Sequence, residues 1–554
     1  MGKVLITAAL PYANANLHLG HLRSTYIPSD IYARYLRSRG EEVAYICATD
    51  EHGTPIAIRA EREDIAPKKL VDKYYDSILK DLKKMGCSFD EFGRTTSPLH
   101  YEFTQEFFSC LLKRGYIYKD EYEQLYCSTC QRFLPDRFVE GLCPHCLGEA
   151  RGDQCESCGR YLKPVELKEP RCVSCENTPE NRKTEHWFFK LSLFKDFLEK
   201  WLSNNQILPS NVKNYSLKWI HEDLIDWCIT RDLSWGVPVP LEGIEGKVIY
   251  VWFDAPIGYI STTVQWAKRL GDPKKWRAFF FEKESKVIHF IGKDIIYHHS
   301  IFWPAMLEAH GDYNLPFKIV AGEYLTLEGK KMSKSRGWSV EVEEYLKKFE
   351  VDPLRYYLIV VSPLNKDADF RWEEYIRRNN DELADIFGNF IHRTLMFTYQ
   401  FFDCQIPQPE SMDDDDNEVF SEIVATKNSI EEAMDEQKFH KALRDIINLA
   451  AIGNKYLNHK KPWKTLKVEP QKAATTLYVA NQLVKALAIM IEPFMPLTAE
   501  KIWLTLKISK SIHVTNWEEI YNKLQPEHKI NKPKPLFVKI AMEDYAKNVQ
   551  ARLN

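Results

Sequence analysis

Four Cys-x-x-Cys pairs between residues 127 and 175 constrain the fold of this chain more than any other feature of its sequence. The pairs are Cys127–Cys130, Cys143–Cys146, Cys155–Cys158 and Cys172–Cys175. Eight thiols at this spacing are enough for two tetrahedral four-thiolate zinc sites, and in a cytosolic chain such pairs indicate metal rather than disulfides. Residues 116–179 also carry many turns and little long periodicity. We therefore expect a small module in which metal takes the place of a hydrophobic core.

The pairing of the cysteines has two solutions. A sequential arrangement joins the first pair to the second and the third to the fourth. A nested arrangement forms one site from Cys143, Cys146, Cys155 and Cys158, and a second from Cys127, Cys130, Cys172 and Cys175. We favour nesting, because the short loop 147–154 makes a compact knuckle and the outer pairs then lie on two chains that run back beside each other. The alternative to metal binding is a set of reduced structural cysteines. We assign the module no catalysis.

The cysteine segment interrupts an α/β pattern. We expect buried strands at residues 4–10, 43–48, 248–253, 287–291 and 317–321. Helical stretches follow at residues 18–39, 67–85 and 99–114. Strands that alternate with helices favour a parallel sheet. The parts of the chain before and after the cysteine segment therefore complete one sheet, with residues 116 to about 229 inserted into it.

The stretch from Thr7 to His21 combines a strand, a turn and the start of a helix. Backbone N–H groups point outward at such a position, and the imidazoles of His18 and His21 can donate hydrogen bonds to an anion. Gly20 leaves no side chain between the backbone and a flat ligand. Asp50 also lies just beyond a strand end, where parallel sheets bind their ligands. The pattern fits a nucleotide site, although two histidines alone are also compatible with packed or surface residues.

A basic loop follows the last predicted strand, at residues 327–337. It contains Lys330, Lys331, Lys334 and Arg336, and Gly329 and Gly337 bracket these residues. Lysines are compact positive charges suited to phosphate. The plainer interpretation of such a loop is a solvated basic turn.

The rest of the chain is predicted to be helical. Helical apolar spacing covers residues 345–357, 373–402, 418–436, 439–457 and 473–508. We expect the acidic stretch 411–417 to be a loop and residues 512–554 to form a tail packed back on the body. The net charge of −3 over 554 residues restricts any nucleic-acid surface to a local patch. No apolar run of membrane-spanning length and no signal peptide are expected, which favours a cytoplasmic protein.

Two motifs in this frame resemble the signatures of the class I aminoacyl-tRNA synthetases. They are His18-Leu-Gly-His21 and Lys331-Met-Ser-Lys-Ser335, in the expected order on either half of an interrupted α/β domain. The stretches ALPYANANLHLGH, ATDEHGTP, YVWFDAPIGYI, HFIGKDIIYHHSIFW and GKKMSKSRG resemble the methionyl-tRNA synthetase family. The resemblance covers about residues 1–480, and the four cysteine pairs resemble the two-knuckle branch of that family, which fits nesting.

The resemblance implies a Rossmann-like α/β catalytic domain, interrupted by a zinc-knuckle insertion and followed by an all-α anticodon-binding bundle. The implied division is 1–115 and 230–325 for the catalytic halves, 116–229 for the insertion, 326–378 for a linker with the basic loop, 379–520 for the bundle and 521–554 for a tail. It implies a ligase that forms methionyl-adenylate from methionine and ATP, and then transfers the methionyl group to the 3′ end of tRNA(Met). Another class I synthetase, or a non-catalytic zinc-bearing tRNA-binding relative, is the alternative.

The same resemblance implies residue roles. His18, His21, Lys331 and Lys334 would be catalytic. ATP, with Mg²⁺, would bind His18, Gly20, His21, Arg231, Gly292, Asp294, Lys331 and Lys334. Methionine would bind Leu10, Tyr12, Asp50, Trp252, Ala255, Pro256, Tyr259 and His299, with Asp50 on the α-ammonium group. The choice of His299 over His298 depends on aligning the motif.

For tRNA, the implied readers of the CAU anticodon are Asn389, Arg393, Asn454 and Trp463. Asn389 and Arg393 are four residues apart on one helix face, and Trp463 follows a proline between two helices. Single-stranded bases are read by stacking and by hydrogen bonds to their edges, which these residue types provide. We expect a monomer, with a separate tRNA-binding protein as a possible partner in trans.

Overall fold

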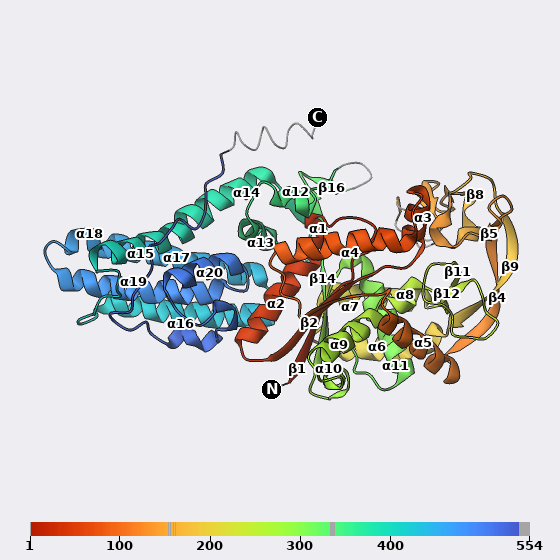
Figure 1. Cartoon of the computed structure of the whole chain (residues 1–554), viewed down its shortest axis with the longest axis horizontal. Coiled ribbons are helices and arrows are strands. Elements are labelled where there is room, and N and C mark those ends of the chain that lie inside the picture. Colours follow the sequence, from red (N-terminus) through yellow and green to blue (C-terminus); the bar gives the residue numbers. More distant parts are fainter. Residues whose placement is uncertain are drawn as a thin grey trace.

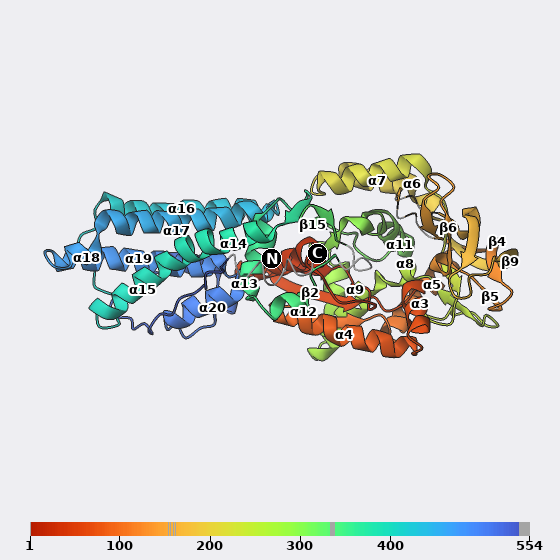
Figure 2. The same ribbon diagram turned by 90° about the horizontal axis from the view of Figure 1, so that it is seen from above.

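The computed structural model describes residues 2–541, except residues 153, 154, 156, 159, 161 and 333–337 and the side chain of Asp223. The molecule is elongated, and a bundle of helices forms one end of it (Figure 1). The strands that carry the cysteine pairs form the other end, and the central sheet lies between the two (Figure 2). This arrangement confirms the predicted fold class of an interrupted α/β unit followed by helices.

The central sheet has five parallel strands in the order β14-β13-β1-β2-β3. Their bounds are β1 Lys3–Ala8, β2 Glu42–Thr49, β3 Glu91–Arg94, β13 Lys286–Gly292 and β14 Lys318–Gly322. Strands from before and after the cysteine segment thus complete one sheet, as predicted. The strand order reverses at β1, and in open parallel sheets ligands bind beyond the strand ends at such a point.

Helices cover both faces of the sheet, because successive side chains of a strand point to opposite faces. Val4 and Ile6 of β1 belong to the same buried apolar cluster as Ile31, whereas Leu5 belongs to a second cluster with Ile260. The helices of this part are α1 Leu19–His21, α2 Ile27–Ser38, α3 Thr54–Arg62, α4 Pro67–Lys84, α5 Pro98–Lys113, α6 Lys195–Asn204, α7 Ser210–Asp223, α9 Ile257–Arg269, α10 Lys275–Phe281 and α11 Trp303–His310.

The strand predicted at residues 248–253 is wrong in its second half. Strand β12, Lys247–Ile249, ends at Ile249 and pairs antiparallel with β11, Thr230–Asp232, in a sheet of its own. Helix α8, Val251–Asp254, then begins. A short apolar run has no periodicity that separates a buried strand from a buried helix, which explains the error.

The cysteine segment contains two small antiparallel sheets. One has the order β10-β9-β4-β5, from β4 Ile117–Cys127, β5 Arg132–Phe133, β9 Glu180–Phe189 and β10 Trp227–Cys228. The other consists of β6 Val139–Leu142, β7 Glu149–Arg151 and β8 Lys168–Cys172. Strands β4 and β9 pair along almost their whole length. The chains that lead to and from the outer cysteine pairs therefore run side by side, as the nested arrangement predicted.

A linker region and the bundle follow. The linker has a three-stranded sheet of β15 Leu325–Leu327, β16 Lys330–Lys331 and β17 Ala368–Phe370, with helices α12 Val342–Leu346 and α13 Val351–Val360. The bundle is built from α14 Trp372–Arg378, α15 Asn389–Phe401, α16 Asp414–Asp435, α17 Phe439–Lys460, α18 Pro462–Thr465, α19 Pro470–Ile491 and α20 Pro496–Thr505. A π-helical stretch, Asn379–Gly388, joins α14 to α15.

Three predicted boundaries in this region are wrong. The helix predicted at 345–357 is split into α12 and α13, with Pro353 in the first turn of α13, where proline is tolerated. The helix predicted at 473–508 ends at Ile491, and α20 begins at Pro496. The acidic stretch 411–417 is a loop only in part, because α16 begins at Asp414. Asp413 accepts the N-cap hydrogen bond there, and acidic residues in a first turn favour the helix.

Helix α19 is long and apolar enough to cross a membrane, by length and composition, and the apolar window is fully buried inside the protein. This corrects the expectation that no run reaches such a length. Its burial shows that the apolar surface of α19 is used in packing the bundle.

The tail packs on the body up to residue 541, as predicted: Asn379 donates a hydrogen bond to the carbonyl of Val538 at 3.0 Å, and Trp517 is fully buried. Residues 542–554 lie outside the described residues.

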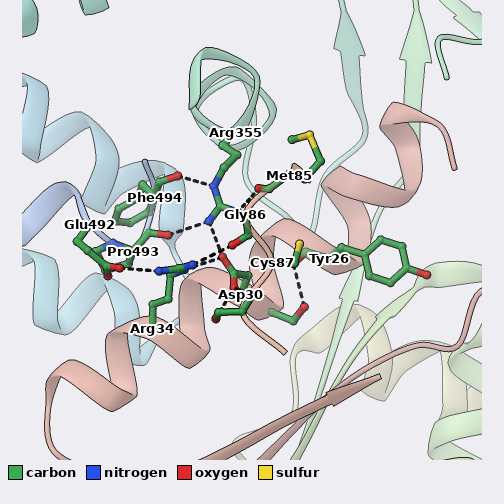
Figure 3. Close-up of polar contacts among 12 residues, drawn as sticks. Tyr26, Asp30, Arg34, Met85, Gly86, Cys87, Arg355, Glu492, Pro493 and Phe494 are labelled. Carbon is green, nitrogen blue, oxygen red and sulfur yellow. Dashed lines mark hydrogen bonds and ion pairs between the residues drawn. The ribbon is translucent and has the colours of Figure 1, made fainter. Parts of the chain in front are cut away.

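A buried set of ion pairs, the Asp30–Arg355 cluster, ties the sheet region to the bundle (Figure 3). Asp30 of α2 binds Arg34 at 2.9 Å and Arg355 of α13 at 2.7 Å. Arg34 also binds Glu492, at the end of α19, at 2.6 Å. Arg355 donates three further hydrogen bonds, to the carbonyls of Met85, Pro493 and Phe494. These contacts, and the apolar cluster shared by β1 and the bundle, fix the two parts relative to each other.

Candidate active site

The two histidines of the first motif lie at the start of α1, just beyond β1. His18 is the N-cap residue, and its Nδ1 accepts a hydrogen bond from the backbone N–H of Gly20 at 3.1 Å. The backbone N–H of His18 donates to Nδ1 of His21 at 3.1 Å, and the ring centroids lie 3.8 Å apart. A Cβ atom at position 20 would lie 2.9 Å from Cε1 of His18. Gly20 is therefore needed for His18 to fold over the first helical turn.

The segment that follows the basic loop pairs with this histidine turn. The N–H of Leu19 donates to the carbonyl of Val340 at 3.2 Å, and the N–H of Val342 donates to the carbonyl of Leu17 at 3.0 Å. The side chain of Asn16 adds a hydrogen bond to Glu341 at 2.9 Å. The first motif and the segment that follows the second one, more than 300 residues apart in the sequence, are thus held together by backbone pairing. Lys334 and its neighbours at 333–337 lie outside the described residues.

A cleft of about 1040 Å³ opens between strand ends and the start of the basic loop, and neither His18 nor His21 is among the residues that line it. The predicted site residues that line it are Tyr12, Arg231, Trp252, Asp294 and Lys331. Asp294, just after β13, accepts a hydrogen bond from the hydroxyl of Tyr324. The ammonium group of Lys331 lies 5.6 Å from the centroid of the same tyrosine ring. A carboxylate that follows β13 and a lysine of β16 therefore share one wall of the cleft.

Arg231 reaches the cleft, but its guanidinium group has other partners. It binds Asp136 at 3.0 Å and donates to the carbonyls of Cys228 and Thr230 at 2.8 Å. Gly292 ends β13 as predicted, and a Cβ there would approach only Ser24, at 3.9 Å. Packing within the protein therefore does not demand glycine at position 292.

Tyr259 and His299 form a buried hydrogen-bonded pair at the predicted methionine pocket. The tyrosine hydroxyl lies 2.8 Å from Nε2 of His299, and Nδ1 of His299 lies 3.0 Å from the carbonyl of Ile295. Because a carbonyl only accepts, Nδ1 carries the proton and Nε2 accepts from the tyrosine. Burial, with His289 and His298 close by, lowers the pKa of His299 well below its usual value. The pair is therefore neutral.

His298, the alternative to His299, lies on the aromatic side of the pocket. Its ring stacks on Trp252 with centroids 5.4 Å apart, and its Nε2 bonds the carbonyl of Trp252. Trp252 stacks in turn on Trp227, at 5.6 Å. The two histidines therefore do different things: His298 orients Trp252, whereas His299 orients Tyr259.

Asp50 is a buried carboxyl group, and one of its oxygens accepts no hydrogen bond within the described part of the chain. Its side chain is 5% exposed and its Oδ1 lacks a hydrogen-bond partner among the described residues. Burial, together with the charge of Asp254, raises the pKa of Asp50 well above its usual value. The backbone of Asp50 bridges to Tyr12 beside β1, which places this carboxyl next to a residue that lines the cleft. A cation bound here would satisfy the orphan oxygen.

The other predicted pocket residues surround this region. Leu10 packs against Gly258, where a Cβ would lie 2.8 Å from Cδ2 of Leu10. Ala255 and Pro256 lie between α8 and α9, and Pro256 is buried. The structure therefore brings both halves of the chain to the predicted pocket.

Sequence reasoning missed several residues of the site. Trp235 lines the cleft and donates from Nε1 to the carbonyl of Glu51 at 2.7 Å. Asp254 is fully buried and binds Nδ1 of His52 at 2.9 Å. Burial opposes ionisation of Asp254, but His52 and His100 beside it bring its pKa below the usual value. The sequence signal that could have identified Asp254 is its charge, because it directly follows an apolar run.

The eight cysteines form two nested tetrads, Cys127, Cys130, Cys172 and Cys175, and Cys143, Cys146, Cys155 and Cys158. This confirms the favoured pairing. Sulfur atoms from different pairs lie 3.4–3.9 Å apart. Tetrahedral coordination with a zinc–sulfur bond of about 2.3 Å requires an edge of about 3.8 Å. Both tetrads therefore fit a metal ion of this size.

Of the four predicted anticodon residues, Arg393 and Trp463 lie together at the far end of the bundle. The guanidinium carbon of Arg393 lies 5.1 Å from the ring of Trp463, and both residues line a cavity of about 210 Å³. Asn389 is exposed one helical turn before Arg393. Asn454 instead donates to the carbonyl of Ile386 at 2.9 Å. Asn458, which was not predicted, accepts from Arg393 at 3.1 Å.

Comparison with known proteins gives the same outline. The family model described as tRNA synthetases class I (M) matches residues 4–395, and that of the anticodon binding domain of methionyl tRNA ligase matches residues 406–554. The methionine–tRNA ligases of Methanopyrus kandleri and Methanobrevibacter smithii are each 50% identical to the chain, over 99% and 98% of its length and 81% and 80% of theirs. The crystal structure of Mycobacterium tuberculosis methionyl-tRNA synthetase bound by methionyl-adenylate has a TM-score of 0.81 at 27% identity, over 97% of this chain and 100% of that one.

Proposed function

Because this chain belongs to the methionyl-tRNA synthetase family of class I ligases, we propose how its residues carry out the two steps of that reaction. Methionine and ATP give methionyl-adenylate and pyrophosphate, and the methionyl group then passes to the 3′ end of tRNA(Met). The observation that carries the proposal is the backbone pairing of Leu17 and Leu19 with Val340 and Val342. It supports one crevice built from both ATP motifs.

The first step is an in-line attack of the methionine carboxylate on the α-phosphate of ATP. Positioning and charge stabilisation supply the catalysis of such a step. We propose that His18 and His21 donate hydrogen bonds to the phosphates at the helix start, where Gly20 leaves the turn compact. Lys331, with Lys334, would neutralise the β- and γ-phosphates, and Mg²⁺ would enter with ATP.

The remaining contacts that we propose for ATP involve Arg231 and Asp294, which line the cleft, and Gly292. Asp294 is an exposed carboxylate at a strand end, suited to the ribose hydroxyls, and Gly292 before it leaves room for the adenosine. Arg231 lines the same cleft and adds positive charge there, although Asp136 shares its guanidinium group.

For methionine, we propose that Asp50 binds the α-ammonium group. The orphan Oδ1 of Asp50 supports this role, because a buried carboxylate needs a cationic or donor partner. A thioether is soft and polarizable and favours aromatic surroundings, which Tyr12, Trp252 and Tyr259 supply. The neutral pair of Tyr259 and His299 completes the pocket, together with the apolar side chains of Leu10, Ala255 and Pro256.

For tRNA, we propose that Trp463 and Arg393 read the CAU anticodon, with Asn389 on the same helix face. Trp463 is 38% exposed, so its ring can stack on a base. Asn454 would act indirectly, by holding the backbone at Ile386. Replacing Trp463 with alanine should raise KM for tRNA(Met) about 10- to 100-fold, since stacking on a base is worth about 1–3 kcal/mol. Methionine activation measured without tRNA should not change.

Charging of tRNA(Met) with radioactive methionine tests the proposal as a whole. His21→Ala and Lys331→Ala should each slow charging about 100-fold or more, as expected for lost donors to a charged transition state. Lys330→Ala is the matched control, because Lys330 adjoins Lys331 and contacts the ring of Trp338 instead. Equal charging by wild type, His21→Ala and Lys331→Ala would overturn the proposed site.

We further propose zinc as the metal of both tetrads, on the sulfur spacing given above. A cytoplasmic location, a monomeric state and a tRNA-binding partner in trans stay predictions, as do the domain boundaries. The family's general character as cytoplasmic ligases supports the first of these.

A further inference from the structure

A third group of potential metal ligands lies apart from the cleft and from the cysteine tetrads. Glu106 and Cys110 are four residues apart on one face of α5. His310 ends α11, which packs beside α5. Ligand atoms of the three residues lie within 4.8 Å of one another. None of the three lines the active-site cleft, and the proposed reaction uses none of them.

His310 is the residue that most needs a ligand. It is 7% exposed, and both of its ring nitrogens are buried without a hydrogen-bond partner among the described residues. The rings of Phe107 and Tyr313 hold the imidazole, at centroid distances of 4.5 and 4.9 Å. Buried polar atoms are rarely left unpaired in native structures. The imidazole is thus held between two aromatic rings, and its two nitrogens make no hydrogen bond within the described residues.

Two carboxylates face the two nitrogens of this ring. Nε2 of His310 lies 3.7 Å from Glu106, and Nδ1 lies 3.7 Å from Asp312. Both distances are too long for hydrogen bonds. Zinc bound tetrahedrally to nitrogen and oxygen at about 2.1 Å separates its ligands by about 3.4 Å. The spacing on the Nε2 side is therefore close to that of two ligands of one ion.

We propose that Glu106, Cys110 and the Nε2 atom of His310 form a third metal site, for a borderline divalent transition-metal ion such as Zn²⁺. Asp312 on the opposite nitrogen would fix the ring and its tautomer, as carboxylates beside metal-bound histidines do. A nearby cavity of about 660 Å³, lined by Glu106, His310 and Asp312, gives an ion and a water ligand access. A bound ion would clamp α5, from before the cysteine segment, to α11, from after it.

The surrounding charges set the pH dependence of this site. Burial and the charge of Glu106 raise the pKa of the Cys110 thiol, Asp312 adds to this, and Arg114 and Lys113 oppose it. A metal binds the thiolate, so binding displaces a proton and strengthens as pH rises.

Metal stoichiometry of the full-length protein tests the proposal. Protein with both tetrads loaded with Zn²⁺ is titrated with Co²⁺, and one further equivalent should bind with thiolate-to-cobalt charge-transfer absorption. Cys110→Ser and His310→Gln should lose this equivalent. Cys404→Ser and His221→Gln, which change a cysteine and a histidine elsewhere, should keep it. Asp312→Asn should keep the site but weaken Co²⁺ binding about 10- to 100-fold, an effect that a packing role alone would not produce.

Two outcomes would overturn the proposal. One is a wild-type protein that binds no Co²⁺ beyond the two tetrads. The other is retention of the charge-transfer band in Cys110→Ser. Because His310 is buried and its variant can fail to fold, Cys110→Ser, at a partly exposed position, decides the result. Melting temperature and methionine activation identify any variant that is misfolded.

Discussion

At the scale of single residues, Asp50 is the group whose chemistry most limits what the pocket can bind. Its carboxyl is buried, one oxygen has no partner, and no arginine or lysine forms an ion pair with it in the described part of the chain. In the role we propose for Asp50, an amino-acid ammonium group would supply the missing charge and donors. The neutral pair of Tyr259 and His299 would then face the rest of the ligand without competing for that charge.

The raised pKa of Asp50 gives a pH test. Without ligand, Asp50 holds its proton well above its usual range. Pairing with an ammonium group requires the ionised form, so methionine binding releases this proton and the affinity rises as pH rises through the pKa of the free enzyme. Calorimetric Kd values measured at increasing pH, from the usual carboxyl range of about pH 4 upward, should show this slope. Asp50→Asn should bind about 2–5 kcal/mol more weakly, with little slope. A Kd of the wild type that does not change with pH would contradict the assignment.

Residue types alone predicted part of this site. The motif around His18 and His21 identified a helix start just beyond β1, and the second motif identified Lys331, which lines the cleft. The sequence could not show that His18 folds over Gly20, because that contact depends on backbone geometry. It also could not show that Arg231 is shared with Asp136, 95 residues away, because such a pair is a product of the fold.

At the scale of elements, apolar runs predicted β1, β2, β13 and β14 of the central sheet, since a strand buried on both faces is apolar throughout. They did not predict β3, which is short and carries a charged residue at each end. The same rule failed in the second half of the predicted strand 248–253, where equally apolar residues begin helix α8 at Val251. The acidic stretch 411–417 was misjudged for a different reason. Composition marked it as a loop, but the carboxylates at Asp413 and Asp416 cap α16 and favour its first turn.

The histidine turn of α1 gives a test at this scale. Gly20→Ala places a Cβ within 2.9 Å of the His18 ring, so the imidazole must move although the helix can still form. A shift of about 1 Å in a catalytic group can cost about 100-fold in rate. Methionine-dependent ATP–pyrophosphate exchange should therefore slow by about that factor, while the melting temperature changes little. Normal exchange by Gly20→Ala would mean that the position of His18 is not critical.

At the scale of the whole molecule, one apolar cluster runs from the sheet into the bundle, and the Asp30–Arg355 cluster sits within this junction. Residues from α2, α13 and the end of α19 meet there in a set of charges in which Asp30 and Arg355 are fully buried and Arg34 is 11% exposed (Figure 3). The tRNA-reading end and the activating end therefore belong to one continuous body. No local sequence pattern predicts this cluster, because Asp30 and Arg355 are 325 residues apart.

Breaking that cluster should destabilise the molecule. Arg355→Met leaves Asp30 with one buried partner fewer, and removing one partner of a buried pair costs about 3–5 kcal/mol. Lys539→Met, at the exposed pair with Asp385, is the control and should cost under about 1 kcal/mol.

Arg34 and Arg355 overcome the cost of burial and hold the pKa of Asp30 at about 2. Its stabilising contribution is thus present above about pH 4 and is lost as pH falls through about 2. Urea unfolding of both variants against pH measures these effects, and equal costs for the two variants would contradict them.

The most direct test of the account is ATP–pyrophosphate exchange by the zinc-loaded, full-length protein with single amino acids. We predict rapid exchange with methionine, and much slower exchange with isoleucine, leucine, valine and cysteine. Exchange with one of these amino acids but not with methionine, or no exchange with any amino acid, would contradict the account.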